Sequence, residues 1–186
     1  RAAQVVVAHH GGRFPRRLED IEALPGIGRS TAAAIAVFAF GARAAILDGN
    51  VRRVLARAFG IDGFPGEKAV ENRLWALAES LLPARDIEAY TQGLMDLGAT
   101  LCSRRQPRCG DCPFAAQCVA LRDGRIAELP TPRAPRAVPQ RAVRVLVLLN
   151  RGSVLLERRP PQGIWGGLLS LPELPEGALP RRYAGA

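Results

Sequence analysis

Two groups of residues in this chain have the types and spacing that chemistry requires. The first is a lone carboxylate, Asp48, which follows an apolar run and precedes Gly49-Asn50-Val51. The second is a set of four cysteines in the pattern C-x6-C-x2-C-x5-C. An isolated carboxylate can stabilise a positive charge that develops during a reaction, and four thiolates can hold a metal ion or a metal cluster. Both groups need elements that hold them in place.

A tight turn between two helices precedes Asp48 in the chain. Its sequence is Leu24-Pro25-Gly26-Ile27-Gly28, and a short helix is predicted before it over 18–23. Gly26 and Gly28 permit backbone conformations that are closed to residues with a Cβ. The same five residues are also an ordinary way to join two helices.

The helix after this turn is predicted over 29–40 and ends at Gly41. Unpaired N–H groups at such a helix start favour a bound phosphate. The helix is hydrophobic on all sides after Thr31, which predicts that it is buried. Asp48 then begins the next helix, and taken alone it is most simply an N-cap.

The turn and the aspartate together resemble the helix–hairpin–helix and catalytic-aspartate segment of DNA glycosylases related to endonuclease III. Within that superfamily the chain resembles the adenine-specific mismatch enzymes, because Gly49-Asn50-Val51 follows the aspartate. Ser30 stands where bifunctional relatives carry a Schiff-base lysine. The resemblance implies that Asp48 stabilises the sugar cation, with Asn50 and Ser30 assisting. It also implies DNA contacts, which we assign to Gly26, Gly28, Arg29, Thr31 and Arg52.

The four cysteines predict a metal site, since nothing in the sequence suggests the secretion that disulfides require. By chemistry alone, zinc and a [4Fe–4S] cluster both accept four thiolates. The resemblance to the endonuclease III superfamily implies a [4Fe–4S] cluster held in the loop 102–118. The expected ligands are Cys102, Cys109, Cys112 and Cys118. Arginines inside the first cysteine interval are expected to contact the DNA backbone, namely Arg104, Arg105 and Arg108.

Three further helices are expected around these groups. One covers 49–59 and carries an apolar face, with arginines off that face that are placed to reach DNA phosphates or solvent: Arg52, Arg53 and Arg57. The second covers 67–82 and places Trp75 in the core. The third begins at Asp86, which we expect to cap it, and runs to Leu101.

The charge of the chain favours a nucleic-acid partner. The 186 residues carry a formal net charge of +9, and residues 104–159 hold 12 arginines against 4 acidic residues. A genome rich in G and C explains the preference for arginine over lysine but not this clustering. No apolar run approaches a membrane span. We expect a monomer in the bacterial cytoplasm, associated with the nucleoid.

The chain is expected to contain two domains and a linker. Residues 1–124 form the helical glycosylase domain, and the proline-rich segment 125–141 is a semi-rigid linker. Residues 142–186 begin with a predicted hairpin and resemble the start of the Nudix-related domain of adenine DNA glycosylases. The predicted fold class is mainly α, followed by a partial α/β Nudix-like domain.

The resemblance implies a monofunctional enzyme that hydrolyses the N-glycosidic bond of adenine mispaired with 8-oxoguanine or guanine in double-stranded DNA. One motif of that family does not occur here, the N-terminal glutamate that protonates the departing adenine. We therefore expect a chain truncated at both ends and inactive by itself. The alternatives are a non-catalytic iron–sulfur DNA-binding module, another glycosylase of the superfamily directed at thymine or pyrimidines, and a zinc-binding adaptor.

Overall fold

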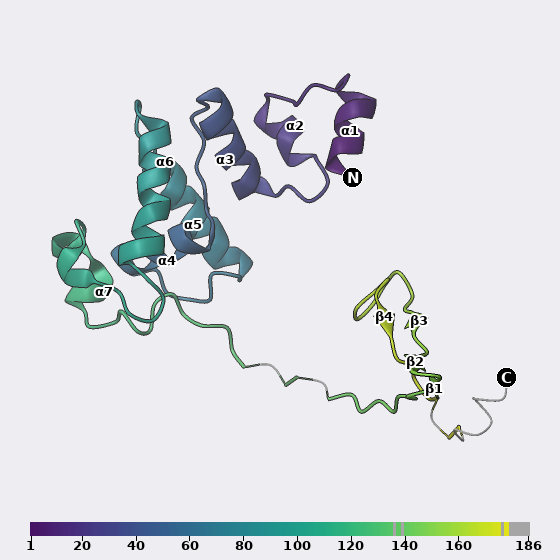
Figure 1. Cartoon of the computed structure of the whole chain (residues 1–186). Coiled ribbons are helices and arrows are strands. Elements are labelled where there is room, and N and C mark those ends of the chain that lie inside the picture. The colour runs from purple at the N-terminus through teal and green to yellow at the C-terminus, as the bar shows by residue number, and fades with distance from the viewer. Residues whose placement is uncertain (136, 139, 176, 179–186) are drawn as a thin grey trace. The chain divides into compact units, whose positions relative to one another are not determined.

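The computed structural model describes residues 1–135, 137–138, 140–175 and 177–178. The chain divides into two compact units, Arg1–Ala134 and Pro135–Ala186. The first unit is helical and the second contains short strands (Figure 1). The expectation of a mainly helical chain with a small β-containing part is confirmed. No helix among the described residues is long and apolar enough to span a membrane.

The helices of the first unit lie close to the predicted positions. Irregular turns carry the cysteines between the last two helices of the unit. The helices are α1 (Ala2–His9), α2 (Leu18–Glu22), α3 (Arg29–Phe40), α4 (Gly49–Ala58), α5 (Lys68–Ser80), α6 (Ile87–Asp96) and α7 (Val119–Arg122). The turns are the π-helical η1 (Leu97–Leu101) and the 3-10 turns η2 (Cys109–Asp111) and η3 (Ala115–Gln117).

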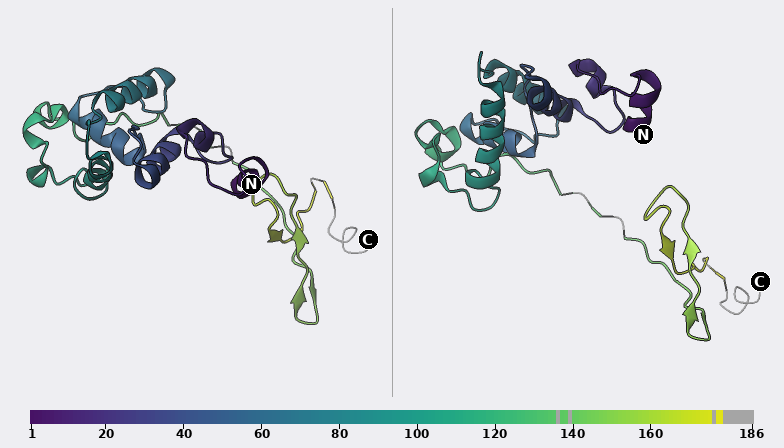
Figure 2. Two further views of the ribbon diagram at one scale, coloured as in Figure 1. Left: turned by 90° about the horizontal axis from the view of Figure 1, so that it is seen from above. Right: turned by 45° about the horizontal axis from the view of Figure 1, so that its top comes forward.

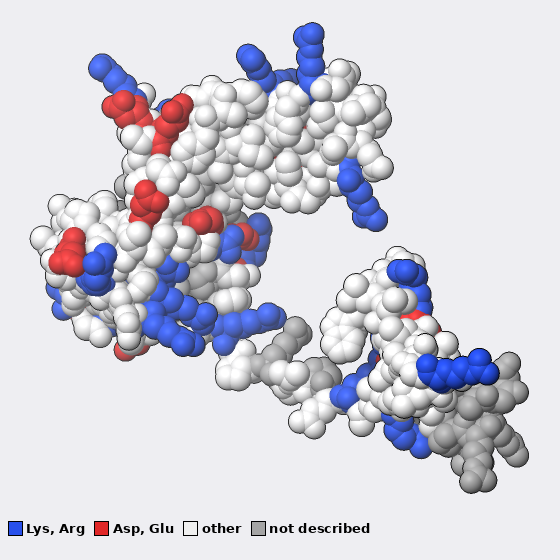
Figure 3. All heavy atoms as spheres, in the orientation of Figure 1, with Lys and Arg blue, Asp and Glu red and all other residues white. Residues whose placement is uncertain are grey.

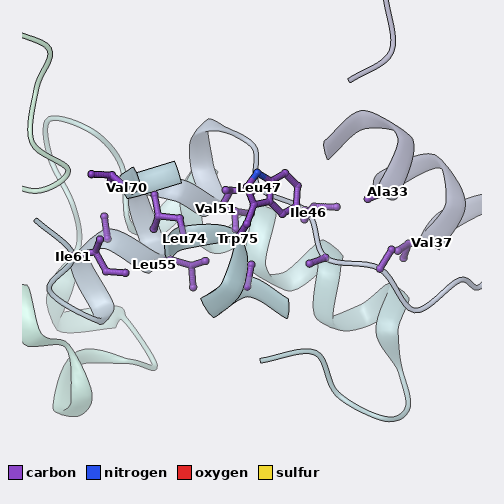
Figure 4. Close-up of a cluster of buried hydrophobic side chains, with 14 residues drawn as sticks. Ala33, Val37, Ile46, Leu47, Val51, Leu55, Ile61, Val70, Leu74 and Trp75 are labelled. Carbon is purple, nitrogen blue, oxygen red and sulfur yellow. The ribbon is translucent and has the colours of Figure 1, made fainter. Parts of the chain in front are cut away.

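Helix α4 lies at the centre of the helical unit, where it contacts α5, α6, η1 and α7. Its apolar face packs Val51 and Leu55 against Leu74 and Trp75 of α5 (Figure 4). Trp75 is only 7% exposed, which confirms that it belongs to the core. Fully burying one large apolar side chain contributes roughly 1.5–3 kcal/mol. This core fixes α4, and with it the position of Asp48 at the start of the helix.

Helix α3 is not buried on all sides, so that prediction was wrong. Its buried residues lie where it contacts α2 and the core, whereas Phe38 is 43% exposed. The residues of α3 are apolar on all sides, but α2 and α6 cover only part of the surface of this helix. The predicted end at Gly41 is correct, because this glycine has φ +64° and its N–H bonds the Val37 carbonyl.

Helix α6 begins at Ile87 as expected, but Asp86 does not cap it through its side chain. Asp86 has φ +57°, whereas a capping residue normally has an extended backbone that aims its carboxylate at the first-turn amides. The helix continues as the π-helical turn η1, which leads directly to Cys102.

The segment 125–134 packs on the helical unit, although the sequence placed it in the linker. Leu129 is 2% exposed, and the Thr131 hydroxyl accepts a hydrogen bond from the Gly63 N–H at 3.2 Å. Arg125 pairs with the side chains of Asp62 and Glu128. We call residues 125–133 the strap. Of the predicted linker, only the part from Pro135 onward belongs to the second unit.

The second unit contains two antiparallel pairs of short strands. Strand β1 (Leu149–Asn150) pairs with β2 (Ser153–Val154), and β3 (Glu157–Arg158) pairs with β4 (Leu169–Ser170). The turn between β1 and β2 has positive φ at Arg151 and Gly152, as a type I′ hairpin turn requires. The predicted first hairpin is therefore present, although its strands are much shorter than the alternation suggested. The residues 179–186 of the predicted Nudix-like domain lie outside the described residues.

Candidate functional site

The turn between α2 and α3 leaves the start of α3 accessible. Gly26 has φ +86°, so a left-handed conformation is present where a glycine was expected. Gly28 has φ −95° and ψ 169°, an extended conformation open to any residue, and the expectation of a special backbone there was wrong. A Cβ at Gly28 would meet nothing within 4 Å. Figure 2 shows in two further views how this turn joins α2 to α3.

The N-terminus of α3 has no side-chain cap, so its first-turn N–H groups are available to an anion. Thr31 is exposed in this turn, as a DNA contact requires. Arg29 is engaged within the protein. Its guanidinium carbon lies 3.9 Å from the centroid of the Trp75 ring, and the side chain pairs with Glu79. Arg29 thus ties α3 to α5, a contact that the sequence did not predict.

Asp48 is half-buried and caps α4. Its Oδ1 accepts a hydrogen bond from the Val51 N–H at 2.7 Å. Ser30 lies next to this segment, because its Oγ accepts a hydrogen bond from the Leu47 N–H at 2.9 Å. Ser30 and Leu47 lie far apart in the chain, and this bond joins the start of α3 to the residue that precedes Asp48. Ser30 is therefore a positioning residue for Asp48 in this arrangement.

Asn50 and Arg52 both make contacts inside the helical unit. The Asn50 Oδ1 accepts a hydrogen bond from the Arg53 Nη2 at 2.8 Å. Its backbone lies so close to η1 that a Cβ at Gly98 would meet the Asn50 Cβ at 2.6 Å. Arg52 donates to the Leu47 carbonyl at 3.1 Å and pairs with Glu71 at 2.9 Å. Both side chains thus hold the start of α4, and their predicted roles toward DNA stay predictions.

The four cysteines gather around one cavity, which they line together with Leu101, Pro107, Arg108, Ala115, Leu121 and Ile126. All four are half-buried. Burial raises the pKa of the Cys109 thiol, and the charges of the other three cysteines raise this pKa further. Without a bound cation, the Cys109 side chain therefore favours its neutral thiol form.

The cysteines share one cavity, but their placement alone does not identify a metal site. Among the described residues, no group of three or more His, Cys, Asp or Glu side chains is arranged to hold a metal ion. The four cysteines line one cavity. Four thiolates are the donor set that [4Fe–4S] clusters use.

Two arginines of α4 reach the cysteine segment. Arg53 donates to the Cys102 carbonyl at 2.7 Å and to the Gly98 carbonyl at 2.6 Å. Arg57 is 3% exposed, so the expectation that it lies on an open face was wrong. The helical pattern placed it off the apolar side, but the cysteine segment and the strap fold over that side and cover it.

A basic groove of about 630 Å³ runs from the start of α4 to the strap. Its walls include six arginines: Arg52, Arg53, Arg57, Arg104, Arg105 and Arg133. Lys and Arg side chains gather at the base of the helical unit, where the chain leaves it (Figure 3). Burial lowers the pKa of Arg53, and the charges of Arg57 and Arg104 also lower it. The groove therefore concentrates positive charge that a polyanion would neutralise.

The predicted arginines of the cysteine loop divide into two groups. Arg104 and Arg105 are exposed and line the groove. Arg108 lines the cysteine cavity and lies 3.9 Å from an Asp111 carboxylate oxygen. Arg133 is a groove residue that the sequence analysis missed, because its segment was assigned to the linker.

Comparisons with known proteins agree with this geometry. A family model described as "Helix-hairpin-helix motif" matches residues 9–38. The chain is 34% identical over 173 residues to an adenine DNA glycosylase of Buchnera aphidicola, a match that covers 93% of this chain and 49% of the relative. The chain spans about half the length of the curated relatives that it matches over most of its own length.

Two solved structures share the fold of the helical part. One is a thermostable thymine-DNA glycosylase, with a TM-score of 0.57 and 38% identity, covering 66% of this chain and 56% of that chain. The other is endonuclease III in a non-covalent complex with DNA, with a TM-score of 0.55 and 24% identity, covering 65% of this chain and 55% of that chain. The second likeness shows the fold alone.

Proposed function

We propose that the chain, which is similar to adenine DNA glycosylases, is a DNA glycosylase of the helix–hairpin–helix superfamily and acts on adenine mispaired with 8-oxoguanine or guanine. The reaction is hydrolysis of the N-glycosidic bond. The observation that carries the proposal is the direct bond between the hairpin and the aspartate segment, from the Leu47 N–H to the Ser30 Oγ. It joins a phosphate-binding helix start to a half-buried carboxylate.

Asp48 supplies the charge that this reaction needs. The adenine leaves the base stack and enters the protein, since its glycosidic bond is out of reach inside the duplex. As the bond breaks, positive charge develops on the deoxyribose, as in other glycoside hydrolyses. The Asp48 carboxylate, held by the Val51 N–H and by the bonded segment before it, stabilises that charge. Asn50 and Arg53 keep the first turn of α4 in place.

The hairpin and the groove hold the DNA. The uncapped start of α3 binds one phosphate through its N–H groups, with Thr31 beside it. Arg104 and Arg105 contact further phosphates from the groove wall. Contacts of this kind fix the position of the duplex and carry no sequence information.

The cysteines Cys102, Cys109, Cys112 and Cys118 hold a [4Fe–4S] cluster in this proposal. When bound, the cluster supplies a rigid crosslink between η1 and α7, and its thiolate ligands are the chemistry that this chain contributes. The loop that carries Arg104 and Arg105 begins at Cys102, so the crosslink fixes the base of the DNA-binding loop.

Water is the nucleophile, and the enzyme is monofunctional. Ser30 stands at the hairpin position of the Schiff-base lysine, and the only lysine of the chain is Lys68 at the start of α5. Lys68 is exposed and pairs with Glu71 at 3.6 Å. Borohydride treatment during turnover should therefore trap no covalent DNA adduct.

In this proposal the strands within residues 142–175 belong to a Nudix-like domain that reads 8-oxoguanine on the opposite strand. This assignment favours adenine over thymine as the substrate, and the sequence match to the adenine enzyme covers 93% of this chain whereas that to a thymine/uracil-DNA glycosylase of Methanothermobacter thermautotrophicus covers 62%. The thymine-specific alternative stays open because of the 38% identity to the thermostable thymine-DNA glycosylase.

A single-turnover assay on matched duplexes tests the proposal. The protein as encoded in its genome should release adenine from A:8-oxoguanine and A:G duplexes and leave T:G duplexes intact. Release of thymine alone would favour the alternative. We expect the 186 residues alone to bind DNA without releasing adenine, because the family's glutamate motif for protonating the base does not occur in this sequence.

A further inference from the structure

Arg57 is a buried cation with no acidic partner among the described residues. It is 3% exposed, and none of the ion pairs found there includes it. Its guanidinium instead donates to three carbonyl oxygens and to one sulfur. The partners are the Leu129 oxygen at 2.8 Å, the Ser103 oxygen at 2.7 Å, the Arg104 oxygen at 3.2 Å and the Cys102 Sγ at 3.4 Å.

A buried guanidinium is unfavourable unless negative charge lies nearby. The cysteines are the groups beside Arg57 that would carry negative charge as metal ligands. One of its N–H groups donates to the Cys102 Sγ at 3.4 Å, and the Cys118 thiol donates to the Arg57 backbone oxygen at 3.6 Å. Arg57 therefore contacts the first and the last cysteine of the set. The carbonyl oxygens and the Cys102 sulfur orient the guanidinium.

We propose that Arg57 is a positioning residue of the cysteine site, where it donates a hydrogen bond to the Cys102 sulfur and fixes the start of the arginine-bearing loop. The inference rests on the proposed [4Fe–4S] site and goes beyond it by assigning a residue that ligates nothing. An N–H···S hydrogen bond from a cation stabilises the more negative, reduced form of a cluster, so Arg57 raises the reduction potential. Its bonds to the carbonyls of residues 103 and 104 hold Arg104 and Arg105 toward the groove.

The full chain carrying Arg57→Lys tests this, because lysine keeps the charge but cannot reproduce the forked set of donors. The matched control is Arg122→Lys on α7, an exposed arginine that bonds only Asp123 among the described residues. The midpoint potential of the cluster should fall in the Arg57 variant by about 59 mV, a tenfold change for one electron. The control should keep the wild-type potential.

DNA affinity gives a second measurement on the same proteins. In Arg57→Lys the loop that carries Arg104 and Arg105 should be held less firmly, so one or two phosphate contacts are lost. For a non-specific duplex, the slope of log affinity against log salt concentration should therefore become less steep by about one to two. An Arg57→Lys protein with wild-type iron content, potential and salt slope would overturn the inference. So would a loss of helical circular dichroism in that variant without the cluster, which would make Arg57 a general core residue.

Iron content separates an error about Arg57 from an error about the cluster. If the wild-type protein contains no iron and lacks the visible absorption of an iron–sulfur cluster, the proposed cluster is wrong. A variant that folds but loses iron more readily than the wild type would support the role of Arg57 in holding the cysteine site.

Discussion

At the scale of single residues, Asp48 has two roles that a substitution can separate. The carboxylate caps α4 through the Val51 N–H, and the proposed mechanism uses its negative charge. Asparagine caps helices about as well as aspartate, but it carries no charge. The structural role and the catalytic role therefore predict opposite outcomes for one substitution.

In the protein that releases adenine in the single-turnover assay, we expect Asp48→Asn to abolish that release while it changes the free energy of unfolding by less than about 1 kcal/mol. DNA affinity should stay close to that of the wild type, because no proposed phosphate contact is removed. Single-turnover release, thermal unfolding and a DNA-binding titration measure the three quantities. Wild-type release by this variant would leave Asp48 with its capping role only.

Ser30 acts on Asp48 through the backbone. Ser30→Ala leaves the N–H of the buried Leu47 without its acceptor, which should destabilise the protein by about 1–2 kcal/mol. It should also slow the chemical step, because the segment before Asp48 loses its attachment to α3. The control is Ser80→Ala. The exposed Ser80 hydroxyl donates to the Leu77 carbonyl at 2.8 Å within α5, so its loss leaves no buried group without a partner. Equal losses of stability in the two variants would contradict this role.

At the scale of elements, Arg29 connects the hairpin to the core. Its contact with the Trp75 ring and its pair with Glu79 join α3 to α5. A cation–π contact contributes about 0.5–2 kcal/mol. If Arg29 is a bridge between helices, its removal changes stability. If it is a DNA contact, its removal changes the salt dependence of binding instead.

We expect Arg29→Met to lower the free energy of unfolding by about 1 kcal/mol and to leave the salt slope of DNA binding unchanged. Arg17→Met is the control, because the pair of Arg17 with Glu19 is exposed and such pairs contribute little. Urea unfolding and binding titrations at several salt concentrations measure the two effects. If the salt slope of DNA binding is lower by about one in the Arg29 variant, Arg29 contacts a DNA phosphate, as the sequence suggested.

One contact of the strap, the pair of Arg125 with Asp62, depends on pH. The hydrogen bond from Arg125 holds the pKa of Asp62 below its usual value of 3.8. A lowered folded-state pKa means that the stabilisation from this pair is complete above the unfolded value and is lost as the pH falls through the folded one. The Asp62 side chain is exposed, so the pair contributes little, and Leu129 and Thr131 keep the strap in place without it. Protection of residues 125–133 from hydrogen exchange at neutral pH should therefore fall only slightly in Asp62→Asn, and Asp123→Asn, whose pair lies on α7, should leave it unchanged.

At the scale of the whole chain, the two units are separable. The boundary lies after Ala134, so the packed strap belongs to the helical unit and the remaining proline-rich segment connects the units. Limited proteolysis should cut first within 134–141 and release a fragment that keeps its helical circular dichroism. First cuts inside 125–133 would show that the strap is not packed as described.

Local signals were sufficient to predict the helices and the candidate residues. A glycine turn, a capping aspartate and an apolar period each act within one or two helical turns, so the sequence placed the hairpin, α3, α4 and the cysteine loop close to their observed bounds. The same locality identified Asp48, whose side chain bonds a residue three positions later. The cysteine spacing predicted the ligands of a metal site and the family resemblance predicted a cluster, and both stay predictions.

Contacts between distant segments were decided only by the tertiary structure. The bond from Leu47 to Ser30, the burial of Arg57 and the packing of Leu129 each join residues that the periodicity of one helix cannot relate. The helical pattern predicted Arg57 on a polar face, and the prolines predicted Leu129 in a linker. Each prediction considered one segment without the segments that pack against it. Whether a residue is buried depends on what packs against it. Composition alone therefore could not show that Arg57 of α4 and Leu129 of the strap cover each other.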